Sequence, residues 1–249
     1  LKLNLRGHTA EDISNATKLL KDAGFKICYH IMPNLPGSDI KKDEEVFKII
    51  FSNPNFQPDL LKIYPCAILK EAPLYRLWKA EKYKPYTEKQ LICLLLKIKK
   101  QIPYYCRIQR LTRDIPSSSI VTGPTKISNM RQILEKLSKK QGWRCKCIRC
   151  REVKENYDPE EKLYLYQQDY SASDGKEIFL SYENKDRTRL YSLLRLRVPS
   201  FALRALKGGP SKNIFIPVLK DSAIIRELHT YGQLHPLNSG AISPQHKGL

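Results

Sequence analysis

The chain has 249 residues, 41% of them hydrophobic, which is enough for one large domain or two modest ones with a real core. It carries 44 basic and 25 acidic residues, a net charge of +19 that is typical of proteins binding polyanions. We find no run of about 18 apolar residues and no signal peptide, which disfavours a membrane or secreted protein. Seven cysteines, an odd number scattered along the chain, favour a reducing compartment, so we expect a cytoplasmic protein.

Helical and strand patterns alternate in the first half of the chain. Residues 9–24 predict a helix that Thr9 caps and Gly24 ends. The mostly apolar stretch 25–32 predicts a buried strand. Further helices are expected over 39–51, 73–81 and 87–101, and further strands over 60–65 and 106–111. This alternation is typical of parallel α/β architecture, in which crossover helices join buried strands.

The pattern changes in the second half of the chain. A basic helix is expected over 126–141. Segments rich in Tyr, Leu and Ile then predict strands over 162–170, 177–183, 189–198 and 223–232. Turn signals such as SDGK and ENKD separate these segments, which favours a largely antiparallel sheet. The change of pattern places a domain boundary within residues 115–158.

Positive charge is concentrated between residues 97 and 151. This stretch contains fifteen Lys or Arg residues and two acidic ones, Asp114 and Glu135. Such clustering is the electrostatic signature of nucleic-acid binding, although a solvated surface is the alternative. Tyr104, Tyr105 and Trp143 are interleaved with these cations and are candidates for stacking on unpaired bases, with a role as buried aromatics as the alternative.

Three cysteines are grouped in the segment GWRCKCIRCRE. Cys145, Cys147 and Cys150 supply three soft ligands within six residues, a donor set that suits zinc or an iron–sulfur cluster. The neighbouring cations favour the thiolate form. A tetrahedral zinc needs a fourth ligand, and the sequence leaves this open: one of the histidines, another cysteine or water could supply it. Three cysteines without a metal in a basic hairpin remain the alternative. The five histidines are His8, His30, His229, His235 and His246.

Ten sequence blocks in one order resemble the catalytic subunit of the Elongator complex in its archaeal or eukaryotic form, over nearly the whole chain. They are RGHT (6–9), LLKDAGFK (19–26), HIMPNLPGSD (30–39), NPNFQPDLLKIYPC (53–66), RIQRLTRDIP (107–116), CKCIRCRE (145–152), EIFLSYE (177–183), LLRLR (193–197), IIRELHTYG (224–232) and QHKGL (245–249).

The resemblance implies a two-part enzyme. The expected α/β fold comprises the C-terminal part of a radical S-adenosylmethionine (SAM) partial barrel over residues 1–115 and a basic, zinc-binding linker over 116–157. The N-terminal part of a mixed α+β GNAT acetyltransferase domain follows over 158–249. The implied reaction adds a carboxymethyl-type group to C5 of the wobble uridine of tRNA. It uses acetyl-CoA, S-adenosylmethionine and a four-iron four-sulfur cluster.

The same resemblance implies where the ligands bind. The backbone of 227–230 would lie beside acetyl-CoA, His229 or Glu227 would be a candidate proton acceptor, and segment 30–39 would lie near S-adenosylmethionine. The cluster-binding cysteine motif of the family is absent from this sequence, and the acetyltransferase glycine loop is represented by Gln245 and Gly248 alone. The chain by itself is therefore expected to be inactive. Expected acetyl-CoA contacts are Glu227, Leu228, His229, Thr230, Gln245, Gly248 and Leu249. Expected tRNA contacts are Lys126, Arg131, Lys139, Lys140, Arg144, Lys146, Arg149 and Arg151.

Two other functions remain open at this stage. The family was also long described as a histone acetyltransferase, and a non-catalytic RNA-binding scaffold fits the incomplete cofactor sites. Charge favours RNA over histone tails, because the cationic stretch 97–151 would repel a cationic tail and attract tRNA. Accessory Elongator subunits or a second copy of the chain are the further partners expected, with no membrane involved.

Overall fold

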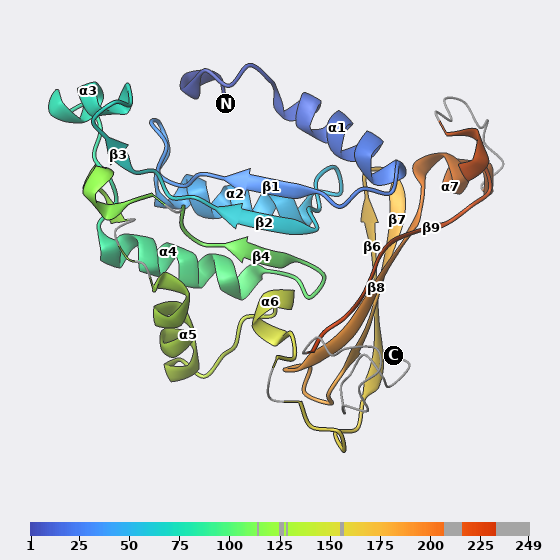
Figure 1. Cartoon of the computed structure of the whole chain (residues 1–249). Coiled ribbons are helices and arrows are strands. Elements are labelled where there is room, and N and C mark those ends of the chain that lie inside the picture. The colour runs from blue at the N-terminus through green and yellow to red at the C-terminus, as the bar shows by residue number, and fades with distance from the viewer. Residues whose placement is uncertain (114, 125–126, 128, 155–156, 207–215, 233–249) are drawn as a thin grey trace. The chain divides into compact units, whose positions relative to one another are not determined.

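A computed structural model describes all residues except 114, 125–126, 128, 155–156, 207–215 and 233–249 (Figure 1). The chain forms two compact units. The first comprises Leu1–Ala10, Cys28–Ser52 and Pro58–Cys147, and the second comprises Glu11–Ile27, Asn53–Gln57 and Ile148–Leu249. The chain therefore crosses between the units more than once, and residues 11–27 belong to the second unit.

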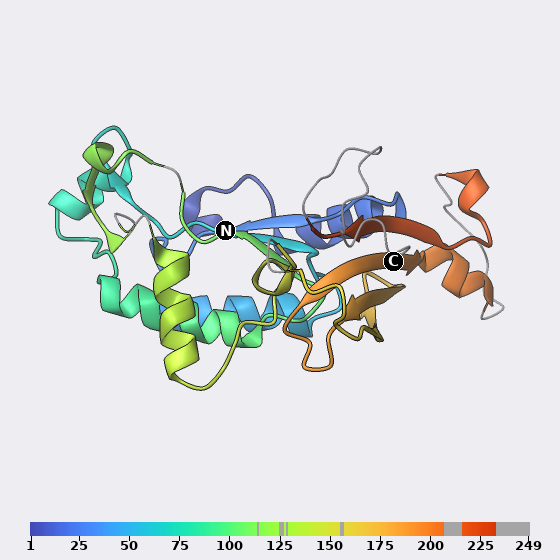
Figure 2. The ribbon, with the colours of Figure 1, turned by 60° about the horizontal axis from the view of Figure 1, so that its bottom comes forward.

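A three-stranded parallel sheet organises the first unit. Its strands are β1 (Cys28–Ile31), β2 (Leu60–Ile63) and β4 (Arg107–Arg110), in the order β1-β2-β4. Both pairings are parallel, as the alternation of helices and strands predicts. The crossover helices α2 (Ile40–Ser52) and α4 (Glu88–Gln101) lie together on one side of this sheet (Figure 2).

Helix α4 begins where the sequence predicts. Thr87 accepts a hydrogen bond from the backbone N–H of Gln90, and the Gln90 side chain accepts one from the Thr87 N–H, which is a capping box. Its buried residues Leu91, Leu94 and Ile98 recur at helical spacing and form part of the core. The remaining elements of this unit are η1 (Lys2–Asn4), β3 (Ile68–Leu69), α3 (Leu74–Lys79), η2 (Ser117–Ser119), β5 (Ile120–Thr122) and α5 (Met130–Lys140).

A four-stranded antiparallel sheet organises the second unit, as predicted. Its strands are β6 (Tyr164–Ala172), β7 (Gly175–Glu183), β8 (Leu190–Val198) and β9 (Ile224–Thr230), in chain order. The predicted SDGK turn joins β6 to β7 with positive φ at Ser173 and Asp174, the conformation of a two-residue hairpin loop. This unit also contains most of α1 (Ala10–Asp22), together with α6 (Ile148–Arg151), α7 (Ser200–Leu206) and η4 (Pro217–Leu219).

A buried network of charges ties α1 to this antiparallel sheet. Arg197 is fully buried and donates to Asp22 from Nε at 2.8 Å and from Nη2 at 2.6 Å. Its Nη1 donates to Glu177 at 2.8 Å, and Arg226 donates to the other oxygen of Glu177 at 2.7 Å. A Cβ at Gly175 would lie 2.6 Å from Nη2 of Arg197, so the glycine leaves room for the guanidinium. The charges offset one another within the second unit, and none of this network follows from sequence periodicity.

Three structural expectations need correction. The strand expected over 25–32 is limited to Cys28–Ile31 and is half-exposed rather than buried, because one face of its sheet carries polar side chains. The helix expected over 126–141 begins only at Met130. The antiparallel pair of β3 and β5 was not expected, because strands of two and three residues are too short to show a periodic pattern.

Candidate functional site

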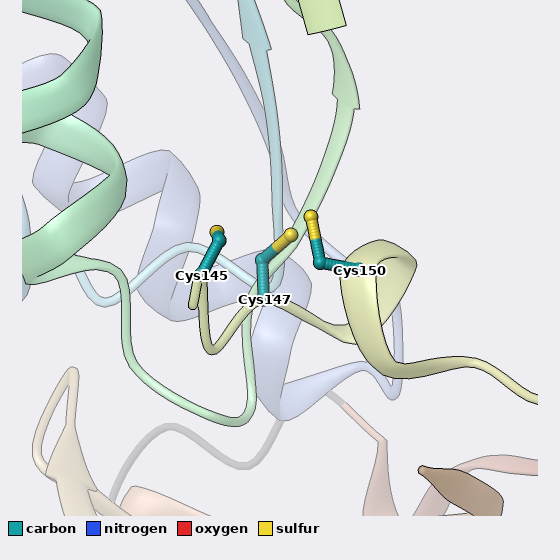
Figure 3. Close-up of side chains that lie close together, drawn as sticks. All are labelled: Cys145, Cys147 and Cys150. Carbon is teal, nitrogen blue, oxygen red and sulfur yellow. The ribbon is translucent and has the colours of Figure 1, made fainter. Parts of the chain in front are cut away.

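The three grouped cysteines converge in the structure. Figure 3 shows the side chains of Cys145, Cys147 and Cys150 close together, with Cys150 on the short helix α6. Their sulfur atoms all lie within 4.8 Å of one another. Cys147 is fully buried and Cys145 nearly so, whereas Cys150 is exposed. None of the seven cysteines, all in the described part of the chain, forms a disulfide.

This geometry fits a zinc ion with three thiolate ligands. Zn–S bonds of about 2.3 Å in a tetrahedron put sulfur atoms about 4 Å apart, which is compatible with sulfur separations of at most 4.8 Å. Within the described residues, the group contains no histidine or carboxylate to complete the tetrahedron. His235 and His246, two of the fourth ligands considered from the sequence, lie outside the described residues. The fourth ligand would then be a water or another residue.

Four of the expected tRNA contacts are exposed cations of the first unit: Lys139, Lys140, Arg144 and Lys146. Lys139 forms a surface ion pair of 2.8 Å with Glu135, and Lys146 lies 5.5 Å from the ring centre of Tyr104. Lys140 and Arg144 are exposed, and no ion pair to a described residue is found for either one. Lys140 and Arg144 are therefore the most available cations of the set.

The other expected contacts are placed differently. Arg131 is half-buried and donates to the carbonyls of Ile108 at 3.1 Å and Gln109 at 3.4 Å. Arg149, in the second unit, is exposed and lies 4.0 Å from a carboxylate oxygen of Glu152. Lys126 lies outside the described residues.

Two residues are corrected by their burial. Arg151 is only 4% exposed and forms an ion pair of 2.5 Å with the fully buried Glu183. Because Arg151 is buried within the second unit, it is not a surface cation that could contact tRNA. Tyr105 is 2% exposed and packs edge-on against Phe51, so it offers no face for base stacking. Trp143 is half-exposed and donates from Nε1 to Gln141 at 2.9 Å.

Strand β9 carries the described part of the expected acetyl-CoA segment. It is the last strand of the sheet, so among the described strands one edge of its backbone has no neighbour. The register shifts where Arg195 pairs with Glu227 and Leu196 with Ile225, leaving a bulge at Arg226. Leu228 is 68% exposed, and His229 is exposed beside Tyr231, with ring centres 4.3 Å apart. Gln245, Gly248 and Leu249 lie outside the described residues.

The surroundings of Glu227 make it a poor proton acceptor. Lys26 lies 2.8 Å from one carboxylate oxygen, and Arg195 lies 2.7 Å from the other. Burial by itself would raise the pKa of Glu227, but Arg195 and Lys26 outweigh burial and hold that pKa below its usual value. A carboxylate with a lowered pKa is a weak base at neutral pH. Of the two acid–base candidates, His229 is thus the better placed.

Comparisons with known proteins identify relatives of this chain. Residues 58–140 match the Radical_SAM C-terminal domain family. The chain is 43% identical over 251 residues to a tRNA uridine(34) acetyltransferase of Methanocaldococcus jannaschii, covering 98% of this chain and 44% of that protein. It is 37% identical over 253 residues to Elongator complex protein 3 of Homo sapiens, covering 98% and 44%. The chain is a homologue of the Elongator catalytic subunit.

A solved Elongator relative has the same fold. This structure, the archaeal Methanocaldococcus infernus Elp3 with a deletion of residues 1–46, superposes with a TM-score of 0.84 at 41% identity. The match covers 100% of this chain and 57% of that one. The chain spans about half the length of the curated Elongator relatives it matches. Within the described residues, no helix is both long and apolar enough to cross a membrane.

The sequence pattern missed one polar cluster that includes Asn34 of segment 30–39, the segment expected to lie near S-adenosylmethionine. Asn34 follows β1 with a positive φ of 65°, and its backbone N–H donates to the buried Asp43 at 2.7 Å. Tyr83 donates to the Asn34 carbonyl at 2.6 Å, and Tyr86 donates to Asp43 at 2.8 Å. These bonds fix the loop at the carboxyl end of β1. The signal in the sequence was a polar Asn between two prolines, which also fits a plain turn.

Proposed function

We propose that this chain is part of an enzyme that modifies the wobble uridine of tRNA, using acetyl-CoA and radical SAM chemistry. The observation that carries the proposal is the 37–43% identity to tRNA uridine(34) acetyltransferases and Elongator proteins over nearly the whole chain. Acetyl-CoA is assigned to β9, the last strand of its sheet among the described strands, because the backbone of an edge strand suits an amide-rich ligand arm. The radical step is assigned to the unit that contains residues 58–140.

The parts of the chain take these roles in the proposal. Residues 1–115 supply the later strands of the radical SAM partial barrel, residues 116–157 the basic linker, and residues 158–249 the acetyltransferase domain. Cys145, Cys147 and Cys150 hold a zinc ion that stiffens the linker. The iron–sulfur cluster and S-adenosylmethionine would supply the radical, and segment 30–39 would lie near S-adenosylmethionine. We place the protein in the cytoplasm, with tRNA as its partner and other Elongator subunits or a second copy as further ones.

The basic linker gives the first prediction. Changing Lys140 and Arg144 to Gln should weaken tRNA binding by roughly tenfold at physiological salt, because both are exposed cations. The slope of log affinity against log salt should become shallower by about 0.7 for each phosphate that is no longer neutralised. A gel-shift titration at several salt concentrations measures both. The matched control is Lys48→Gln, an exposed lysine of α2 in the same unit; equal losses of affinity in the two proteins would contradict the proposal.

The choice between RNA and histone gives the second prediction. In the gene product that contains this chain, acetyl-CoA turnover should require tRNA and should not rise with a basic histone peptide. Release of CoA thiol, followed with a thiol-reactive dye, measures the rate in each case. Turnover that rises equally with the peptide in the absence of RNA would favour a protein acetyltransferase. Tight tRNA binding with no turnover under any condition would favour a non-catalytic RNA-binding scaffold.

A further inference from the structure

Strand β9 is held against residues 24–26, the segment that joins α1 to β1. The guanidinium of Arg226 donates from Nη1 to the carbonyl oxygen of Phe25 at 2.7 Å. A Cβ at Gly24 would lie 3.3 Å from the Cγ2 methyl of Ile224, so the backbone at Gly24 passes close to that side chain. Both segments belong to the second unit, and these contacts fix residues 24–26 beside the first half of the strand.

The bulge in β9 turns two consecutive side chains toward one face of the sheet. Arg226 donates to Glu177 at 2.7 Å, and the next residue, Glu227, lies 2.7 Å from Arg195. Glu177 and Arg195 share a face, because Glu177 is the register partner of Arg197 and Arg195 lies two residues before Arg197. Side chains normally alternate along a strand, and a bulge breaks that alternation. The bulge therefore aims the Glu227 carboxylate at the face that Arg195 occupies.

Lys26 meets this carboxylate from the segment before β1. Its Nζ lies 2.8 Å from Oε1 of Glu227, and its side chain is 41% exposed. Glu227 begins the run 227–230 that the proposed function assigns to acetyl-CoA. The amine of Lys26 is thus within hydrogen-bond distance of the assigned site and is also open to solvent. Ion pairs of exposed lysines are weak, so this amine can leave the carboxylate.

We propose that Lys26 is acetylated by the acetyl-CoA held at β9, as a self-modification of the enzyme. The inference rests on the proposed function, which places acetyl-CoA at this strand. The Lys26 ammonium first gives a proton to water, because Glu227 is a weak base. The nitrogen lone pair then attacks the thioester carbonyl carbon, and the C–S bond breaks. The nitrogen loses a second proton, the CoA thiolate takes one up, and an amide remains on Lys26.

Proximity is the reason to expect this lysine rather than another exposed one. A bound thioester presents a far higher effective concentration to a neighbouring amine than the same thioester does in solution. Lys176 is the matched comparison, because its side chain is 45% exposed and its Nζ lies 2.7 Å from Asp169. It equals Lys26 in exposure and in ion pairing. Lys176 is on β7, however, and β8 separates β7 from β9.

The experiment treats the gene product that contains this chain with isotopically labelled acetyl-CoA in the absence of tRNA. Peptide mass spectrometry follows the acetylation of each lysine. Lys26 should be labelled about tenfold faster than Lys176, because only Lys26 lies beside the bound thioester. Excess free CoA should slow the labelling of Lys26 and leave that of Lys176 unchanged. Lys26→Arg should lower the number of acetyl groups gained per intact chain by one.

Acetyl phosphate separates proximity from intrinsic reactivity. It lacks the CoA moiety and should label Lys26 and Lys176 at similar rates. The same preference for Lys26 with acetyl phosphate as with acetyl-CoA would overturn the proposal, since the amine would then be reactive by itself. Equal labelling of both lysines by acetyl-CoA, in a protein that binds acetyl-CoA in a calorimetric titration, would refute this inference alone. Absence of acetyl-CoA binding would instead refute the proposed function.

Discussion

Replacing Arg197 with methionine should lower the free energy of unfolding of the second unit by about 3–5 kcal/mol, the usual result of breaking a buried ion pair. Methionine leaves Asp22, which is 3% exposed, without the guanidinium that neutralises it. Ser200 still donates to Asp22 at 2.7 Å, but a neutral donor does not replace a charge. Glu177 is affected less, because Arg226 and Lys21 remain beside it. Urea denaturation of the chain, followed by circular dichroism, measures the loss.

Two further variants separate charge from packing in this network. Lys176→Met removes a surface ion pair with Asp169 on the same sheet and should cost less than about 1 kcal/mol. Adding Asp22→Asn to Arg197→Met should recover part of the lost stability, because the unpaired charge is then gone. If the double variant is less stable than Arg197→Met by the full cost of Asp22→Asn alone, the two residues act independently. Their charges would then not be energetically coupled.

Replacing Cys147 with serine should abolish zinc binding. Cys147 is the most deeply buried of the three thiols, and a hydroxyl is a poor substitute for thiolate as a soft ligand. The affinity should fall by more than the roughly 10–100-fold that loss of an outer hydrogen-bond partner typically costs. Elemental analysis should find about one zinc per chain in the parent protein and almost none in the variant. A chelator should reproduce the effect in the parent protein.

The matched control for the zinc prediction is Cys93→Ser. Cys93 is exposed on α4 and does not belong to the group of three sulfurs, so its loss should leave the zinc content unchanged. Iron together with inorganic sulfide, in place of zinc, would support the iron–sulfur alternative. A folded parent protein that contains neither metal would contradict a metal role for the three cysteines.

Local patterns were enough for most elements. Helix α4 follows from apolar residues at helical spacing after a Thr cap, and the hairpin of β6 and β7 follows from SDGK between two runs of strand-forming residues. These signals act over a few residues, so the sequence carries them directly. The strand 25–32 was wrongly expected to be buried, because composition over eight residues hides the alternation that puts Cys28 and His30 on a polar face.

The candidate sites were predicted to different degrees. The cysteine group could be found because its ligands lie within six residues, and the structure brings the three sulfurs together. The cations of residues 97–151 could be counted from the sequence, but the exposed ones could not be told from the buried ones. Lys99 and Arg151 are buried, and Arg131 donates to backbone carbonyls.

The sequence by itself determined the types of the main elements, the parallel and antiparallel halves, the three-cysteine group and the family resemblance. Each of these depends on residue spacing or on order along the chain. The tertiary structure decided which charges are buried in pairs and which side chains share a face. Arg197 meets Asp22 across 175 positions, and Cys28 meets Gln109 across 81, through strand register and helix packing. The free energy of burying a charge depends on its neighbours in space, and a linear pattern does not contain them.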